Sequence, residues 1–114
     1  VVMGEWGGLC PKKTDWFSHI DFVYSLIEQN QWSSLYWNYY FENDEFVRLM
    51  NRPYPIAVCG DIISYRTDSN ERKFFMEYKV SDDYVLAETQ IYVPNKGVQK
   101  FKSNYGINKI EISY

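Results

Sequence analysis

A single carboxylate near the start of the chain has the surroundings expected of a reactive group. Glu5 ends the apolar run of residues 1–4 and is followed by Trp6 and two glycines. A continuous apolar run bounded by glycine favours a strand buried on both faces, as in a parallel sheet. Ligands bind at the carboxyl ends of such strands, so we expect Glu5 to project into a site with Trp6 beside it. The alternative is a strand that runs into a glycine-rich turn and leaves Glu5 merely solvated.

Trp37 is the second candidate group, because it lies in the aromatic segment of residues 34–39. If this segment is a parallel neighbour of the first strand, about 4.8 Å away, Glu5 and Trp37 face one cavity. A carboxylate beside an indole suits a retaining glycosidase. The carboxylate attacks the anomeric carbon, while the aromatic face stacks on the sugar ring and excludes water.

A retaining glycosidase also needs a second carboxyl group, about 5–5.5 Å from the first, to protonate the leaving oxygen. The chain offers no convincing candidate for this acid. Glu42, Asp44 and Glu45 follow the second strand in a polar run and are expected to be solvated.

The spacing of apolar residues predicts the elements that would position these groups. Thr14 or Asp15 can cap a helix, and Asn30 can end one in the left-handed conformation. Between these limits apolar residues recur at helical spacing through about Glu28, namely Phe17, Ile20, Val23 or Tyr24, and Ile27. With strands over residues 1–5 and 34–39, this makes a strand–helix–strand unit of the length expected for a right-handed parallel crossover.

The second half of the chain has the pattern of a small antiparallel β-sandwich. Pro53 and Pro55 exclude a helix where they stand, because each removes a donor and pushes the preceding residue to extended geometry. Runs with strand chemistry follow, separated by turn clusters, over residues 61–67, 72–80, 86–93 and 107–114. In the last run Ile110 and Ile112 fall on one face. The predicted fold class is therefore α/β plus all-β, with a boundary near Asn51.

Composition narrows the classes of partner and cofactor. A net charge of −3 argues against nucleic acid, because phosphate binding needs a basic face. No run of eighteen apolar residues is present to span a membrane. Cys10 and Cys59 match no metal spacing and His19 has no Cys or His at ligand spacing, so we expect no metal and no cofactor. The two cysteines can form one disulfide or remain free, and His19 is expected at the surface.

Four segments then occur in an order known from one family: Gly4-Glu5-Trp6-Gly7, Tyr36-Trp37-Asn38-Tyr39-Tyr40, Arg52-Pro53-Tyr54-Pro55 and Thr89-Gln90-Ile91-Tyr92-Val93-Pro94. Together they resemble the C-terminal end of a family 5 glycoside hydrolase of the endoglycoceramidase-like group. The resemblance implies that residues 1–51 are the C-terminal portion of a (β/α)8 TIM barrel and residues 52–114 the β-sandwich that follows it. It also implies that Glu5 is the catalytic nucleophile and that Trp37 lines the subsite where the bond breaks. The family's general acid follows the fourth barrel strand, outside this chain.

The resemblance implies an O-glycosyl hydrolase that cleaves β-glycosidic bonds of glycolipids, with a role in glycosphingolipid catabolism. The expected partner is a glycolipid or β-glucoside substrate, with peripheral membrane contact through the lipid and a monomeric protein. The chain starts at Val1 inside an apolar run, so we expect a fragment or trimmed chain that is inactive alone and folds marginally. Its compartment stays open, with a secreted or endomembrane location slightly favoured.

Three alternatives remain open at this point. A related β-glucosidase could act on glucosylceramide or on steryl glucosides. A non-catalytic carbohydrate- or lipid-binding sandwich would explain the aromatic content of 19%. A decayed fragment could keep the strands without any function.

Overall fold

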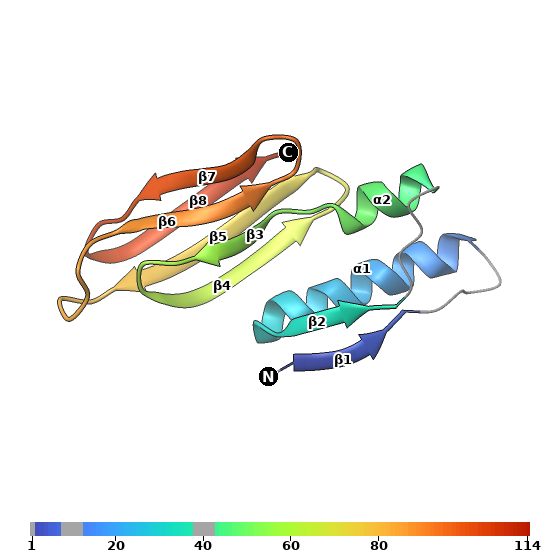
Figure 1. Ribbon diagram of the computed structural model, residues 1–114, viewed down its shortest axis with the longest axis horizontal. Helices are drawn as coiled ribbons and strands as arrows, with labels where there is room; N and C mark the ends of the chain where they lie inside the picture. Colours follow the sequence, from blue (N-terminus) through green and yellow to red (C-terminus); the bar gives the residue numbers. More distant parts are fainter. Residues whose placement is uncertain (1, 8–12, 38–42) are drawn as a thin grey trace. The chain divides into compact units, whose positions relative to one another are not determined.

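The computed structural model describes residues 2–7, 13–37 and 43–114. The chain divides into two compact units, Val1–Asn51 and Arg52–Tyr114, and each is described by itself. In its described residues the first unit contains β1 (Val2–Trp6), α1 (Lys13–Asn30), β2 (Ser33–Tyr36) and α2 (Asp44–Met50) (Figure 1). The second unit contains β3 (Tyr54–Ala57), β4 (Asp61–Asp68), β5 (Lys73–Val80), β6 (Glu88–Val93), β7 (Gly97–Lys102) and β8 (Gly106–Ser113).

The first unit has the predicted strand–helix–strand order. Strands β1 and β2 pair in parallel, and α1 connects them. The strand predicted over residues 34–39 begins one residue earlier and ends at Tyr36, while residues 38 and 39 lie outside the described part of the chain.

Helix α1 buries Ile20, Val23 and Ile27 of the predicted apolar stripe, while Phe17 is only partly buried and its neighbour Trp16 is buried instead. The predicted caps are wrong. The helix begins at Lys13, so Thr14 and Asp15 lie within its first turn, where the carboxylate of Asp15 suits the positive end of the helix dipole.

The left-handed residue that ends α1 is Gln31, with φ of 54°, and not Asn30 as predicted. The Gln31 N–H bonds to the Glu28 carbonyl at 3.2 Å, and the Trp32 N–H bonds to the Ile27 carbonyl at 3.0 Å. This pair of bonds is a Schellman motif, which satisfies two carbonyls that the last turn would otherwise leave open.

Helix α2 is an element that the sequence analysis missed. The run around Asp44 and Glu45 is exposed, as predicted, but it is helical. The Asn43 side chain caps it by accepting from the Phe46 N–H at 2.9 Å. Phe46, on the opposite face, is fully buried in the core of the first unit.

The second unit has the predicted sandwich-like architecture, built from two three-stranded antiparallel sheets ordered β3-β6-β7 and β4-β5-β8. Alternate residues of β5, β6 and β8 point inward and form one core, which contains Phe74, Met76, Tyr78, Val80, Ile91, Val93, Ile110 and Ile112. The alternation predicted for the last strand is confirmed, since Ile110 and Ile112 are buried while Lys109 and Glu111 are exposed. Cross-strand ion pairs lie on the outer face of this sheet, including Lys73 with Glu111 at 3.3 Å.

Strands β3 and β7 were not predicted. Strand β3 contains Pro55, which a sheet tolerates only at an edge, and β3 is an edge strand. Strand β7 has the sequence GVQKFK, which is too polar to be predicted as a strand from its residues alone. The predicted start of β6 at residue 86 moves to Glu88, because the Ala87 N–H bonds to the Cys59 thiol at 3.3 Å instead of joining a ladder.

Candidate active site

The pairing of β1 with β2 slips by one residue at Gly4. Met3 pairs with Ser34 and Glu5 pairs with Leu35, so β1 has one more residue here than its partner. Met3 and Trp6 both pack into the core under α1, although they lie three residues apart and regular alternation would put them on opposite faces. The extra residue resolves this conflict and leaves Glu5 on the face away from α1.

Trp37 lies on the same face as Glu5. Tyr36 packs into the core under α1, so its neighbours Leu35 and Trp37 point to the other side, where they are 61% and 66% exposed. The Trp37 N–H donates to the Trp6 carbonyl at 2.8 Å, which continues the parallel pairing one residue beyond β2. The two predicted site residues therefore follow adjacent strands at the same carboxyl edge.

Gly7 brings the two strand ends into close contact. Its φ of 138° is one that side chains rarely adopt, and a Cβ at this position would collide with the carbonyl oxygen of Trp37. The glycine after Glu5 and Trp6 thus lets the backbone of the second candidate residue approach. The sequence analysis noted this glycine without assigning it a role.

The sequence suggested that Trp6 lies beside Glu5 in the site, but the structure places Trp6 in the core. Its ring is 7% exposed and meets Tyr24 and Tyr36 edge-on, at centroid distances of 5.4 and 4.7 Å. The strand alternates, so a side chain next to Glu5 along the chain points into the core. The Trp6 indole N–H has no hydrogen-bond partner among the described residues.

An aromatic cluster in the core packs against the carboxyl ends of β1 and β2 on the face that α1 covers. The Trp16 indole N–H donates to the Tyr36 hydroxyl at 3.3 Å, and Phe46 stacks on Trp16 at 5.3 Å. Trp6 joins the cluster through Tyr36. These contacts draw on β1, α1, β2 and α2, so all four elements fix the strand ends that carry Glu5 and Trp37.

Among the other candidates, those that the structure describes are two exposed acidic residues, an exposed histidine and a buried thiol. Asp44 and Glu45 are exposed in the first turn of α2, and Glu42 and Asn38 lie outside the described residues. His19 is exposed on α1, as predicted, and Cys59 is a buried free thiol, while Cys10 is not among the described residues. Within residues 2–7, 13–37 and 43–114 no His, Cys, Asp and Glu side chains gather as a metal site. No helix in that part is long and apolar enough to cross a membrane.

The C-terminal half matches one known family. Residues 52–112 match the model described as the glycoside hydrolase family 5 C-terminal domain. The match covers more than half of the chain and coincides with the second unit.

Two solved structures share the fold. The crystal structure of Cryptococcus neoformans sterylglucosidase 1 with tris matches with a TM-score of 0.67 and 14% identity, over 84% of this chain and 23% of that chain. The same protein with hit 1 matches with a TM-score of 0.65 and 12% identity, over 86% of this chain and 24% of that chain. This chain thus spans about a quarter of the length of those structures. No curated protein sequence matches it.

Proposed function

This chain belongs to the family of glycoside hydrolase family 5 C-terminal domains, and from this membership we propose that it is the terminal part of a retaining glycoside hydrolase. The second unit is the C-terminal β-sandwich of that enzyme. The first unit, residues 1–51, is the last portion of its (β/α)8 catalytic barrel. The structural likeness supports including the first unit: it covers 84% of the chain, whereas residues 52–112 alone are about half of it.

The observation that carries the proposal is the position of Glu5. It is exposed at the carboxyl end of β1, on the face away from α1, and shares that face with Trp37 of the adjacent strand. In a (β/α)8 barrel the helices cover the outer face of the strands, and active sites form where the strands end. These positions support Glu5 and Trp37 as active-site residues of such a barrel.

The proposed reaction is a double displacement. The carboxylate of Glu5 attacks the anomeric carbon, and the bond from that carbon to the aglycone oxygen breaks. A carboxylic acid outside this chain gives its proton to the leaving oxygen. The same group then takes a proton from water, which attacks the glycosyl-enzyme and releases Glu5 and a sugar of retained configuration. The indole of Trp37, with 66% of its surface free, stacks on the sugar ring.

The proposed substrate is a β-glucoside with a lipid aglycone, such as a glycosylceramide or a steryl glucoside. The structural neighbours are sterylglucosidases, which supports this class of substrate.

Covalent labelling tests the nucleophile. In the protein extended upstream to the whole barrel, an activated 2-deoxy-2-fluoro-β-glucoside should label Glu5, as read by peptide mass spectrometry. Glu5→Gln should lower turnover by several orders of magnitude, because it removes the group that forms the intermediate. Glu45→Gln, an exposed glutamate of α2, is the matched control and should retain turnover.

Two results would contradict the proposal. One is normal turnover by the Glu5→Gln protein, or a label on another residue. The other is hydrolysis of an alkyl β-glucoside by the 114-residue chain alone, because an alkoxide leaving group needs a proton from the acid that the proposal places outside this chain.

A further inference from the structure

One end of the second unit carries a concentration of exposed apolar side chains. The antiparallel register brings three connections to this end: β3 to β4, β5 to β6 and β7 to β8, at the left of Figure 1. The exposed side chains here form what we call the apolar tip: Tyr84, Val85, Leu86, Tyr105 and Ile107. Val85 is 87% exposed, the largest exposure of any large apolar side chain in the described residues.

The backbone under the apolar tip is held in place. The Cys59 thiol accepts from the Ala87 N–H at 3.3 Å and lies 3.6 Å from the Val85 carbonyl oxygen, to which it can donate. The Tyr105 hydroxyl donates to the Tyr84 carbonyl at 3.4 Å. Polar backbone groups therefore turn inward while the apolar side chains turn outward, so docking would cost little loop entropy.

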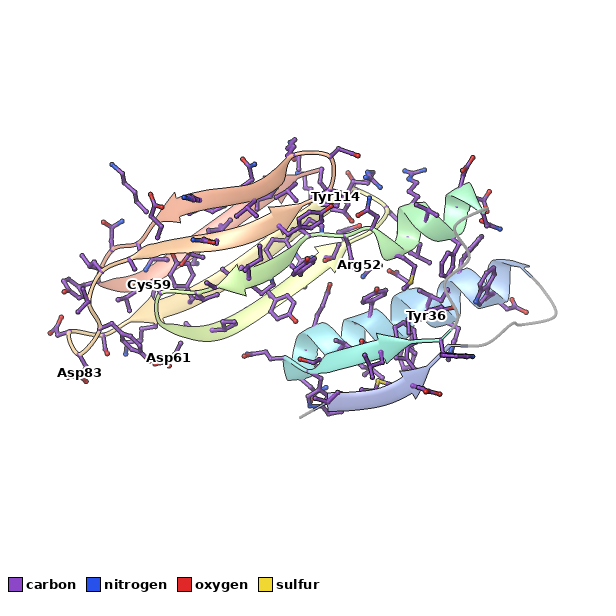
Figure 2. All side chains as sticks on the ribbon, in the orientation of Figure 1. Tyr36, Arg52, Cys59, Asp61, Asp83 and Tyr114 are labelled. Atoms are coloured by element: carbon purple, nitrogen blue, oxygen red, sulfur yellow. The ribbon has the colours of Figure 1, made fainter. Side chains whose placement is uncertain are left out.

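Carboxylates outnumber lysines around the apolar tip, where Lys79 pairs across the sheet with Asp61 and Ile107, and Lys102 pairs with Glu88. Asp61, Asp82 and Asp83 are exposed at the same end, and Figure 2 shows Asp61 and Asp83 there beside Cys59. The Tyr84 hydroxyl donates to Asp61 at 2.8 Å. The hydrogen bond to Asp61, together with its charge and that of Asp83, raises the pKa of the Tyr84 phenol above its usual 10.0. Residues 81–87 and 103–107 contain no lysine or arginine.

Exposed apolar and tyrosine side chains next to carboxylates favour one kind of binding partner, a lipid surface. Apolar and tyrosine side chains favour the boundary between lipid headgroups and acyl chains. An excess of carboxylates is repelled by anionic lipids but complements the quaternary ammonium of choline, which also binds to aromatic faces. We propose that the apolar tip docks on a neutral lipid surface whose headgroups carry choline. The inference rests on the proposed function in one respect: an enzyme with a lipid aglycone must reach a substrate held in a membrane.

Vesicle flotation with the full 114-residue chain tests this docking surface. Phosphatidylcholine vesicles free of any glycolipid are used, so the result does not depend on substrate binding or catalysis. Val85→Asp should lower the partition coefficient about tenfold, because it removes a large part of the inserted apolar surface and adds a charge. Val98→Asp is the matched control, since Val98 is 48% exposed and lies beside the β6–β7 turn at the opposite end of the unit. It should retain full binding.

Several outcomes would overturn the proposal. They are no flotation with phosphatidylcholine, stronger flotation with phosphatidylglycerol, or equal losses in the two variants. Self-association of the chain that Val85→Asp abolishes in the absence of vesicles would assign the apolar tip to a second copy instead. Flotation that depends on Val85 supports the apolar tip even if Glu5 proves not to be the nucleophile, so the two proposals fail separately.

Discussion

Gly4 and Gly7 lie on either side of Glu5 and differ in what they permit. A Cβ at Gly7 would meet the Trp37 backbone, and the φ of 138° is strained for any other residue. A Cβ at Gly4 would meet nothing within 4 Å. Replacing each glycine by alanine therefore distinguishes two effects. At Gly7 the change tests whether the backbone needs glycine, and at Gly4 it tests only the strand propensity of the residue.

We predict that Gly7→Ala destabilises the first unit by about 2 kcal/mol or more, through strain at φ and displacement of Trp37. Gly4→Ala should change stability by less than about 1 kcal/mol. All four tryptophans lie in residues 6–37, so urea unfolding followed by tryptophan fluorescence reports this unit specifically. Equal losses in the two variants would contradict the assigned role of Gly7.

At the residue scale, sequence reasoning identified Glu5 and Trp37 as candidates but not the groups that hold them. The apolar run of residues 1–4 that ends in Glu5 can be read directly from the sequence. That Gly7 must admit the backbone of Trp37 depends on two segments thirty residues apart, which no local pattern records. Trp6 was misplaced for a local reason: it follows Glu5 directly in the strand, and successive side chains point to opposite faces.

Among the helices and strands, too, those with a clear pattern in their own sequence were predicted, and those that depend on distant residues were missed. Helix α1 was predicted because apolar residues repeat at helical spacing within its eighteen residues, and three of them, Ile20, Val23 and Ile27, are buried. Helix α2 has seven residues and one fully buried side chain, too few for a period to emerge. Strands β3 and β7 were missed because sheet pairing, and not their own sequence, makes them strands.

The end of α1 gives a prediction at this scale. Gln31 holds a φ of 54°, a conformation that costs a residue with a side chain about 1 kcal/mol relative to glycine. Gln31→Gly should therefore stabilise the first unit by about that amount. Gln29→Gly, two residues earlier and inside the helix, should destabilise it by about 0.5–1 kcal/mol. The midpoints of urea unfolding should move in opposite directions; a shift in the same direction would contradict the Schellman assignment.

At the scale of the whole molecule the two units differ in how their sheets are completed. Each sheet of the second unit has a central strand, β5 or β6, with a partner on both sides. The described residues of the first unit form two parallel strands, with α1 on one face and exposed Val2, Leu35 and Trp37 among the residues of the other. Parallel sheets normally have both faces covered, and two strands alone are marginal.

Amide hydrogen exchange on the full chain should therefore show its slowest exchange in β5 and β6. Amides of β1 and β2 should exchange faster, because their sheet opens at lower free energy. Extension of the chain by the upstream barrel should slow β1 and β2 while leaving β5 and β6 unchanged. Protection of β1 equal to that of β5 in the chain alone would argue that the first unit is complete without a barrel.

The slip at Gly4 has a consequence for how this strand can change in evolution or by design. Gly4 and Glu5 together occupy the place opposite Leu35, so Gly4 acts as a spacer. Removal of Gly4 would let Met3 pair with Ser34 and Glu5 with Leu35 without a bulge, and it would keep Met3 and Trp6 on the core face and Glu5 on the other. A substitution at position 4 changes only what stands beside Glu5, in open space. The direction of the Glu5 side chain therefore survives both a substitution at position 4 and the loss of that residue.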